Sequence, residues 1–351
     1  MKKLSLRKRQ PVEKTVPSRI TNETVAEHRE RILAGGRRFK YPMQYARHRL
    51  VFTTIVITLV AFLFILLVGW WQLYSVQNTS TFFYRVTRVL PLPVASVDQE
   101  AVPYGDYLMY YNSSAHYLRQ SEQTNFQTKD GQRQNNHIKR KSMDIAIGNA
   151  YANKLARELN ISVTQERIDR VTDEDRNTST GRISQETYDA SALNILGWAP
   201  SEYRQDTKSR LVRQDVAYAI DTQAKKQQEK ATAILQADPA IDFGALATAL
   251  GGEGIAKVTT AQSGLVPLLN QDGGLTAAAV GLAKGGVSSP IRTAAGDGYY
   301  FVKQLEKTAT QVSYVYLRIP LTEFNQRLET LRKDGKIKEY IKIVEEGETS
   351  S

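Results

Sequence analysis

The chain of 351 residues carries 47 Lys and Arg against 36 Asp and Glu, a net charge of +11, and it contains no Cys. The lack of Cys excludes disulfides, thiolate metal sites and thiol nucleophiles. Fourteen of the basic residues but only four Glu lie within residues 1–49. Almost all of the net charge therefore belongs to this segment, and the rest of the chain lacks the bulk positive charge of a nucleic-acid-binding surface.

The segment 50–71 reads LVFTTIVITLVAFLFILLVGWW and contains no charged residue. A helix of about 20 apolar residues matches the hydrocarbon core of a bilayer, so we predict a transmembrane helix over residues 50–73. Because basic residues resist translocation, residues 1–49 are expected in the cytoplasm and the chain after the helix on the extracytoplasmic side of the cell membrane. The following GWWQLYSVQN has no small-x-small cleavage site, which favours a permanent single-pass anchor.

Low periodicity predicts that residues 1–49 are mostly disordered, apart from one short amphipathic pattern over residues 20–33. The charge of this tail fits either attraction to anionic lipid headgroups or a role in setting topology alone. After the anchor we expect a linker over residues 74–91 and a short strand from Val94 to Val97. Residues 346–351 are expected to form a disordered tail.

Residues 92–227 are predicted to form a helical domain. Helical spacing begins at Tyr104, is interrupted by a polar loop at 120–136, and resumes up to Asn160. Thr164 is a predicted N-cap of the next helix, and a further helix from Ser184 ends at Gly197. Pro200 is suited to the first turn of a last helix, which is expected to continue toward residue 235.

Beyond residue 237 the composition changes to Gly, Ala, Ser and Leu with frequent turn signals. Residues 298–306 and 312–320 alternate as strands do, which predicts a small domain of helices and strands over residues 228–320. Helical spacing returns over residues 321–345 with a break at Gly335. The expected fold class is therefore α+β.

Two sets of segments resemble a known group of proteins. In the helical region VASVDQEAVPYGDYLMYY, KLARELNISVTQERID and LGWAPSEYRQDTKSRLV resemble the SurA, PrsA and PpiD group of extracytoplasmic folding factors. Further on, IDFGALA, GLAKGGVSSPIRT and GDGYYFVKQLE resemble their parvulin-type peptidyl-prolyl isomerase domain. The resemblance implies a chaperone that binds unfolded or nascent exported polypeptides. The sequence has no phosphate-loop motif and no metal-ligand spacing, so no cofactor and no metal are expected, and its charge balance after residue 49 predicts no nucleic-acid partner.

The parvulin-like part departs from the family pattern. Parvulins carry paired His residues on their central strands, whereas this chain has His at positions 28, 48, 116 and 137 only. The family's first strand is also missing from its usual place, and we expect residues 312–320 to take that position in the sheet. The aromatic residues expected to line a remaining peptide-binding groove are Tyr299, Tyr300, Phe301, Tyr314 and Tyr316, with Tyr300 and Tyr314 near the positions of the missing His.

Three functions stay open at this point. The expected one is a membrane-anchored chaperone whose parvulin-like domain lacks ordinary catalysis. An active isomerase with an atypical site is an alternative, because prolyl isomerisation needs no covalent chemistry to cross its barrier of about 18–20 kcal/mol. A weaker alternative is a structural protein of the cell envelope that acts through a C-terminal helix at 336–344. No residue is assigned a catalytic role.

Overall fold

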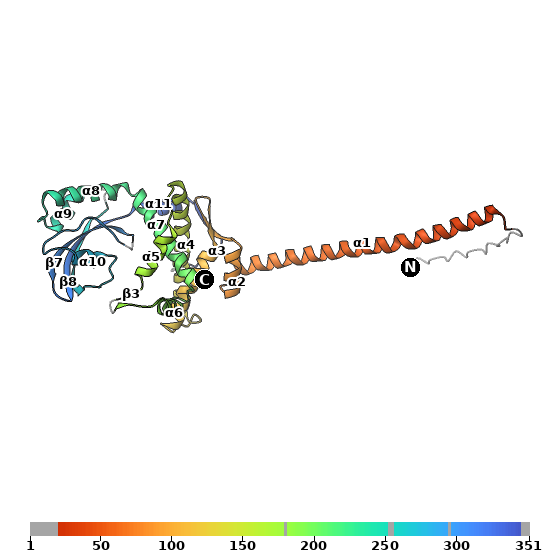
Figure 1. The fold of residues 1–351 in the computed structure, drawn as a ribbon, viewed down its shortest axis with the longest axis horizontal. Helices are drawn as coiled ribbons and strands as arrows, with labels where there is room; N and C mark the ends of the chain where they lie inside the picture. Colours follow the sequence, from red (N-terminus) through yellow and green to blue (C-terminus); the bar gives the residue numbers. More distant parts are fainter. Residues whose placement is uncertain (1–19, 179–180, 252–255, 294–295, 345–351) are drawn as a thin grey trace. The chain divides into compact units, whose positions relative to one another are not determined.

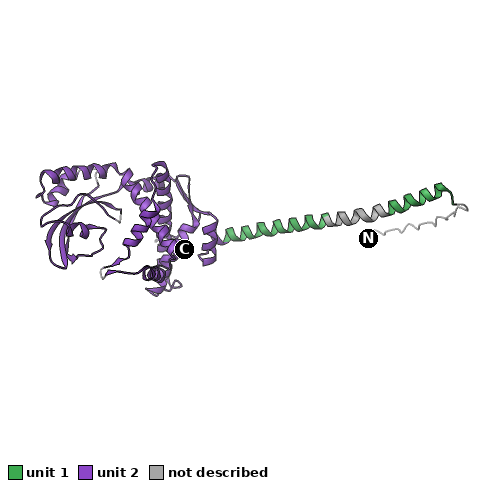
Figure 2. Cartoon of the chain, in the orientation of Figure 1, with its two compact units in different colours: residues 1–71 green, residues 72–351 purple. Residues whose placement is uncertain are grey.

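The computed structural model describes residues 20–178, 181–251, 256–293 and 296–344, without the side chains of residues 36–47. The chain divides into two compact units, residues 1–71 and residues 72–351 (Figure 2). The predicted disorder of residues 1–19 and 346–351 lies outside the described residues.

One long helix, α1 (Asn22–Tyr74), accounts for the described part of the first unit (Figure 1). Its segment His48–Tyr74 is long and apolar enough to cross a membrane by length and composition. The predicted helix over 50–73 is therefore present as a helix. Residues 22–49 were expected to be mostly disordered, and they are helical instead. Helix-favouring Ala, Arg, Glu and Leu, next to an already formed apolar helix, avoid the cost of a new helix nucleus.

The helical part of the second unit begins with a small helix and a strand pair and continues through further helices. Its elements in chain order are α2 (Thr81–Val89), β1 (Pro93–Val97), β2 (Glu100–Pro103), α3 (Tyr104–Gln120), α4 (Lys129–Glu158), α5 (Gln165–Glu174), β3 (Asn177–Thr178), β4 (Gly181–Arg182), α6 (Gln185–Leu196) and α7 (Pro200–Ile220). Helices α3, α4 and α7 and the strand pair share one core, which includes the fully buried Tyr104, Leu108 and Met143.

Four predicted helix ends in this part are confirmed. Thr164 and Ser184 cap α5 and α6 by accepting a hydrogen bond from a backbone N–H three residues on. Gly197 ends α6 with φ 67°, a left-handed conformation that glycine adopts without steric cost. Pro200 occupies the first turn of α7.

Three boundaries differ from the prediction. The linker over 74–91 contains α2, in which Thr87 is buried. The polar loop expected at 120–136 is shorter, because Thr128 caps α4 and polar residues after it are good helix formers. The long helix from Pro200 breaks at Asp221, which leaves helical geometry with ψ 77° and caps a new helix.

The sheet part follows with α8 (Thr222–Ala237), α9 (Phe243–Leu250), β5 (Thr259–Pro267), α10 (Leu275–Val280), β6 (Ile291–Arg292), β7 (Gly298–Lys307) and β8 (Gln311–Pro320). Its four strands have the order β5-β8-β7-β6. Strand β8 pairs antiparallel with β7, placing Tyr300 opposite Arg318, and with β5 on its other side. The prediction that residues 312–320 enter the middle of the sheet is thus confirmed. Helices α8 and α9 cover one face and α10 covers the other (Figure 1).

The end of the chain returns to the helical part through α11 (Glu323–Lys333) and β9 (Ile337–Glu339). The helix predicted after Gly335 is wrong, because β9 pairs antiparallel with β1 and completes the sheet β2-β1-β9. Backbone hydrogen bonding to the open edge of β1 and burial of Ile341 and Ile343 in the helical core outweigh the local helical spacing. The C-terminal helix on which a structural role was expected to depend is therefore absent from residues 336–344.

Candidate functional site

The five aromatic residues singled out from the sequence lie on the two central strands and divide between the faces of the sheet. Tyr299 and Phe301 pack toward α8 and α9, whereas Tyr300 and Tyr314 pack toward α10. Their exposed fractions are 3%, 1%, 8% and 3%. Tyr316 is half-buried against the same core as Tyr300. Four of the rings are therefore core residues, and peptide binding by Tyr316 stays a prediction.

The Tyr300 hydroxyl is held by a carboxylate. It donates to Asp297 Oδ2 at 2.8 Å, and Thr293 and Arg318 bind the same carboxylate at 3.1 and 2.8 Å. Burial, followed by the hydrogen bond to Asp297, raises the pKa of Tyr300 above its ordinary value. This phenol therefore stays protonated and its proton points at Asp297.

The Tyr314 hydroxyl has the same arrangement with a second carboxylate, donating to Asp272. Asp272 also accepts from the Thr276 hydroxyl at 2.5 Å, the Thr276 N–H at 2.9 Å and the Asn270 amide at 3.0 Å. Burial raises the pKa of Asp272, but these hydrogen bonds outweigh it and hold that pKa below its ordinary value. Asp272 is thus a stable anion with its hydrogen-bonding capacity engaged.

These two pairs stand where the family resemblance placed the missing His residues. A phenol whose proton is already donated to a carboxylate is not free to hydrogen-bond a twisting prolyl amide. The described part of the sheet therefore offers a fixed structural network at these two positions. Residues 228–320 contain no His, so the sheet part lacks the imidazole groups that ordinary parvulins carry on their central strands.

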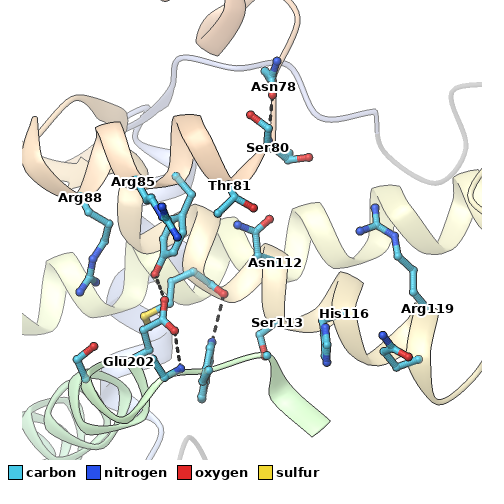
Figure 3. Close-up of a pocket in the computed structure, with 18 residues that line it drawn as sticks. Asn78, Ser80, Thr81, Arg85, Arg88, Asn112, Ser113, His116, Arg119 and Glu202 are labelled. Atoms are coloured by element: carbon cyan, nitrogen blue, oxygen red, sulfur yellow. Dashed lines mark hydrogen bonds between the residues drawn. The ribbon is translucent and has the colours of Figure 1, made fainter. Parts of the chain in front are cut away.

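Two cavities of different character lie elsewhere in the second unit. One, of about 970 Å³, is polar and lies among α2, α3 and the connection from α6 to α7 (Figure 3). The other, of about 700 Å³, lies between the helical part and the sheet part. We call the second cavity the cleft. It is bordered by α5, the β3–β4 hairpin and α7 on one side, and by residues 268–277 and Arg292 on the other.

The cleft combines apolar and cationic side chains with two acidic ones, Glu174 and Asp175. Val171 on α5 and Leu268 and Leu269 in the loop after β5 contribute apolar surface, whereas Leu211 on α7 lines the cleft with only 4% of its surface exposed. Leu269 is 65% exposed, although large apolar side chains gain free energy when they are covered. The cationic side chains of the lining are Arg167, Arg170, Arg182, Arg210 and Arg292.

The arginines of the cleft differ in how firmly they are held. Arg167 binds Asp215, and Arg210 lies 3.6 Å from Asp175. Arg292 lies over the Tyr218 ring, 4.9 Å from its centroid. Among the described residues Arg170 pairs with no carboxylate. The cleft therefore presents apolar surface together with donors for the carbonyl and carboxylate groups of a ligand.

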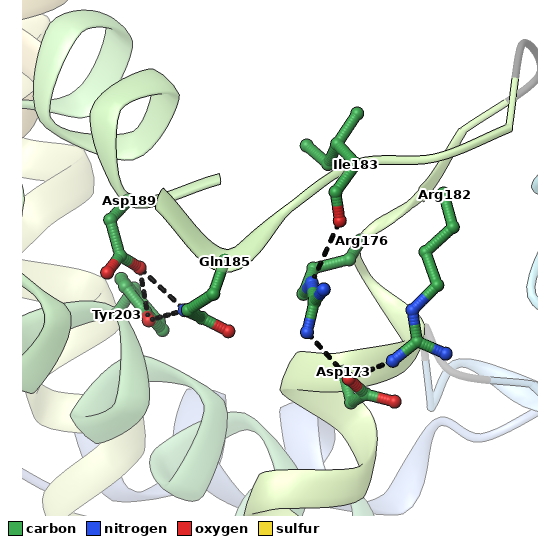
Figure 4. A network of polar contacts seen from close by, with 7 residues as sticks. All are labelled: Asp173, Arg176, Arg182, Ile183, Gln185, Asp189 and Tyr203. Carbon is green, nitrogen blue, oxygen red and sulfur yellow. Dashed lines mark hydrogen bonds and ion pairs between the residues drawn. The ribbon is translucent and has the colours of Figure 1, made fainter. Parts of the chain in front are cut away.

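Polar contacts hold the hairpin wall of the cleft in place (Figure 4). Asp173 on α5 accepts from Arg176 at 3.0 Å and from Arg182 on β4. Arg176 in turn donates to the Ile183 carbonyl at 3.1 Å. The hairpin is thus tied to α5 through Arg182 on β4 and through Arg176, which directly precedes β3.

The start of α6 is fixed against α7 in a similar way. Tyr203 donates to Asp189 at 2.8 Å, and Gln185 donates to both of them (Figure 4). Burial, followed by the hydrogen bond to Asp189, raises the pKa of Tyr203 to about 12. Beyond these contacts α6 leaves Leu193 and Ile195 exposed at 58% and 48%.

The cleft was not found from the sequence, because separate segments of the chain supply its walls. One available signal was the apolar pair Leu268–Leu269 placed directly before the polar turn at 270–274. Such a pair in a turn-rich segment is either buried or available to a ligand, and in the structure Leu269 is exposed.

Comparison with known proteins bears on the helical part. Residues 43–217 match the family model of the SurA-like N-terminal domain. The match extends from within α1 to α7, so it contains the hairpin wall of the cleft but not residues 268–292. No curated protein matches the chain. Residues 43–217 are thus similar to the SurA N-terminal domain, which supports a place for this chain in the SurA/PrsA family.

Proposed function

We propose that this protein is a membrane-anchored extracytoplasmic chaperone that binds unfolded exported polypeptides. The observation that carries the proposal is the cleft, where exposed Leu269 and the apolar Val171 and Leu211 lie among arginines. Apolar surface captures unfolded segments without a fixed sequence, and arginine donors bind their backbone carbonyl groups. The similarity of residues 43–217 to a SurA-like N-terminal domain is consistent with a chaperone-type role.

The membrane location in this proposal rests on α1. Its segment His48–Tyr74 has the length and composition of a membrane span. The fourteen Lys and Arg within residues 1–49 favour a cytoplasmic N-terminus under the positive-inside rule. A chaperone tethered in this orientation acts where exported chains emerge.

The parvulin-like role of the sheet part is proposed to be binding without ordinary catalysis. The engagement of Tyr300 by Asp297 and of Tyr314 by Asp272 supports this, because neither phenol has a free proton. Isomerase activity from an atypical site is the competing function.

The first test measures aggregation of a chemically denatured client by light scattering, with the full chain in lipid nanodiscs. We expect the protein to suppress aggregation and the Leu269→Ser variant to lose most of that suppression. Leu159→Ser is the matched control, since Leu159 is 45% exposed at the end of α4 and outside the cleft. A photocrosslinker at position 269 should capture the client and one at position 159 should not. Failure of the unaltered protein to suppress aggregation would refute the proposal.

A protease-coupled assay on a Xaa-Pro peptide separates the competing function. We expect no acceleration above the uncatalysed rate. Acceleration that Tyr300→Phe and Tyr314→Phe abolish would establish the isomerase instead, because these variants remove only the hydroxyls and keep the buried rings.

A further inference from the structure

Helix α2 begins seven residues after the end of α1, and a polar cavity lies beside it. Asn78, Ser80 and Thr81 belong to the lining of that cavity. Asn78 comes four residues after Tyr74, where α1 ends. Since an extended chain spans at most about 3.6 Å per residue, Asn78 lies within about 14 Å of the end of α1. If His48–Tyr74 spans the membrane, as proposed above, one wall of the cavity lies within reach of the lipid headgroups.

The exposed residues of α2 are the apolar Phe82 and Val89 together with Thr81, Arg85 and Arg88. Phe82 is 68% exposed and Val89 is 80% exposed, and seven residues place them on the same face two turns apart. Leu90, directly after the helix, is 50% exposed. Arg85 lies between Phe82 and Val89 along the helix, toward the side that lines the cavity. An exposed apolar face beside a basic one is the pattern of helices that lie in the membrane interface.

The lining of the cavity carries more positive than negative charge. Its cations are Arg85, Arg88 and Arg119, drawn in Figure 3. Its one acidic side chain, Glu202, is already engaged, accepting from the Tyr84 hydroxyl and from the Ala199 N–H at 2.7 Å.

The three arginines differ in how they are held. Arg88 donates to neutral Gln205, and Arg119 lies over the Phe126 ring at 5.0 Å from the centroid. Among the described residues Arg85 has no ion-pair or hydrogen-bond partner. The Asp106 carboxylate attracts Arg88, so Arg85 and Arg119 are the two cavity cations that pair with no carboxylate among the described residues.

Polar groups on α2 and α3 complete the lining. Thr81, Asn112 and Ser113 border the cavity beside the arginines (Figure 3). Hydroxyl and amide donors among guanidinium groups are suited to phosphate oxygens, which guanidinium binds in a bidentate manner.

We propose that this cavity binds the phosphate of an anionic phospholipid headgroup while Phe82 and Val89 enter the interfacial layer of the same bilayer. The proposal rests on the membrane anchoring in the proposed function, but not on client binding. It gives α2 the role of an interfacial helix that adds a second, lipid-dependent attachment to the span. The orientation in which the chaperone faces emerging chains then depends on the lipid composition of the membrane.

The test uses the absence of Cys in the sequence. A single Val89→Cys variant is labelled with an environment-sensitive fluorophore and reconstituted at full length into nanodiscs of phosphatidylcholine, with or without phosphatidylglycerol. We expect the emission to shift to shorter wavelength when phosphatidylglycerol is present. Leu193→Cys, 58% exposed on α6, is the control label and should not shift.

Charge variants then assign the shift to the cavity. Adding Arg85→Gln or Arg119→Gln to Val89→Cys should remove most of the shift, whereas Arg133→Gln, at an exposed pair with Asp130, should leave it unchanged. Equal emission at position 89 in both membranes would overturn the proposal. Loss of the shift on adding inorganic phosphate would also overturn it, in favour of a free anion as the ligand. Loss of the shift on adding an acidic client peptide would assign the cavity to polypeptide instead.

These outcomes are separate from those of the client assay. If the protein suppresses aggregation but shows no lipid-dependent shift, only lipid binding by the cavity is refuted. If the protein shows the shift but leaves aggregation unchanged, only the proposed chaperone function is refuted.

Discussion

The helical part and the sheet part of the second unit are assembled differently from the same chain. The sheet part uses one continuous segment, from α8 to β8. The helical part uses two, because α11 and β9 return to it after the sheet is complete, and Ile341 and Ile343 join its core. The sheet part is therefore an insertion within the helical part.

One buried side chain lies where the chain leaves the helical part and comes back. Asp221 is 3% exposed and caps α8 by accepting from the Ala224 N–H at 2.9 Å. Its other oxygen accepts from the Thr322 and Glu323 N–H groups at 2.8 and 3.1 Å. The sheet part is thus built from one continuous segment with Tyr218 of α7 added to its core, whereas the helical part is complete only after residues 321–343 return to it.

The largest expected effect tests whether the inserted sheet part can lose stability by itself. Phe301→Ala removes a buried ring that is 1% exposed and should lower the free energy of unfolding by about 4 kcal/mol. Regional hydrogen exchange should show faster exchange over residues 222–320 with α3 and α4 unchanged. An equal loss of protection in α3 and α4 would show that the two parts unfold as one cooperative unit.

The reverse pattern is expected for the returning segment. Ile341→Ala removes a side chain that is 3% exposed in the helical core and should cost about 3 kcal/mol. Exchange should accelerate in β1, α3 and α4 rather than in the sheet part. Val344→Ala, at a side chain 43% exposed, is the control and should change stability by less than about 0.5 kcal/mol. Similar effects of Ile341→Ala and Val344→Ala would mean that the returning segment contributes little to the stability of the helical part.

Asp221→Ala should affect both parts at once. It removes the cap of α8 and leaves two backbone N–H groups near α11 without an acceptor, at a total cost of about 2 kcal/mol. Urea denaturation followed by regional hydrogen exchange measures the effect. Asp242→Ala, which removes the cap of α9 alone, should accelerate exchange only in the sheet part. If Asp221→Ala does the same, Asp221 does not join the two parts.

The difference between the parts also explains what the sequence could predict. Helix ends set by Thr164, Ser184, Gly197 and Pro200 were predicted correctly, because caps and proline act over three or four neighbouring residues. The central position of β8 was predicted from alternation together with the family resemblance. Local pattern was sufficient wherever local interactions decide the structure.

The failures are positions where distant segments decide. Residues 337–339 have helical spacing but pair with β1, more than two hundred residues earlier in the chain. The aromatic residues of β7 and β8 were assigned to a groove, and four of them are buried, because α8, α9 and α10 cover both faces of the sheet. The cleft was missed for the same reason, since its two walls lie far apart in the sequence.

The smallest expected effect concerns the network around Asp272 in the sheet part. Tyr314→Phe removes one hydrogen bond to this carboxylate and should cost about 1 kcal/mol at neutral pH. The pKa of Asp272 is lowered in the folded protein, so its contribution is complete above its unfolded pKa of about 3.9 and is lost as the pH falls toward the folded value. Urea denaturation should therefore show the full difference between Tyr314→Phe and the unaltered protein at pH 7 and a narrowing difference below about pH 4. Tyr316→Phe, whose hydroxyl does not bind Asp272, should show no such change with pH. A difference for Tyr314→Phe that stays constant at all pH values would mean that its hydroxyl does not stabilise the Asp272 anion, and that the tyrosine pair is held by packing alone.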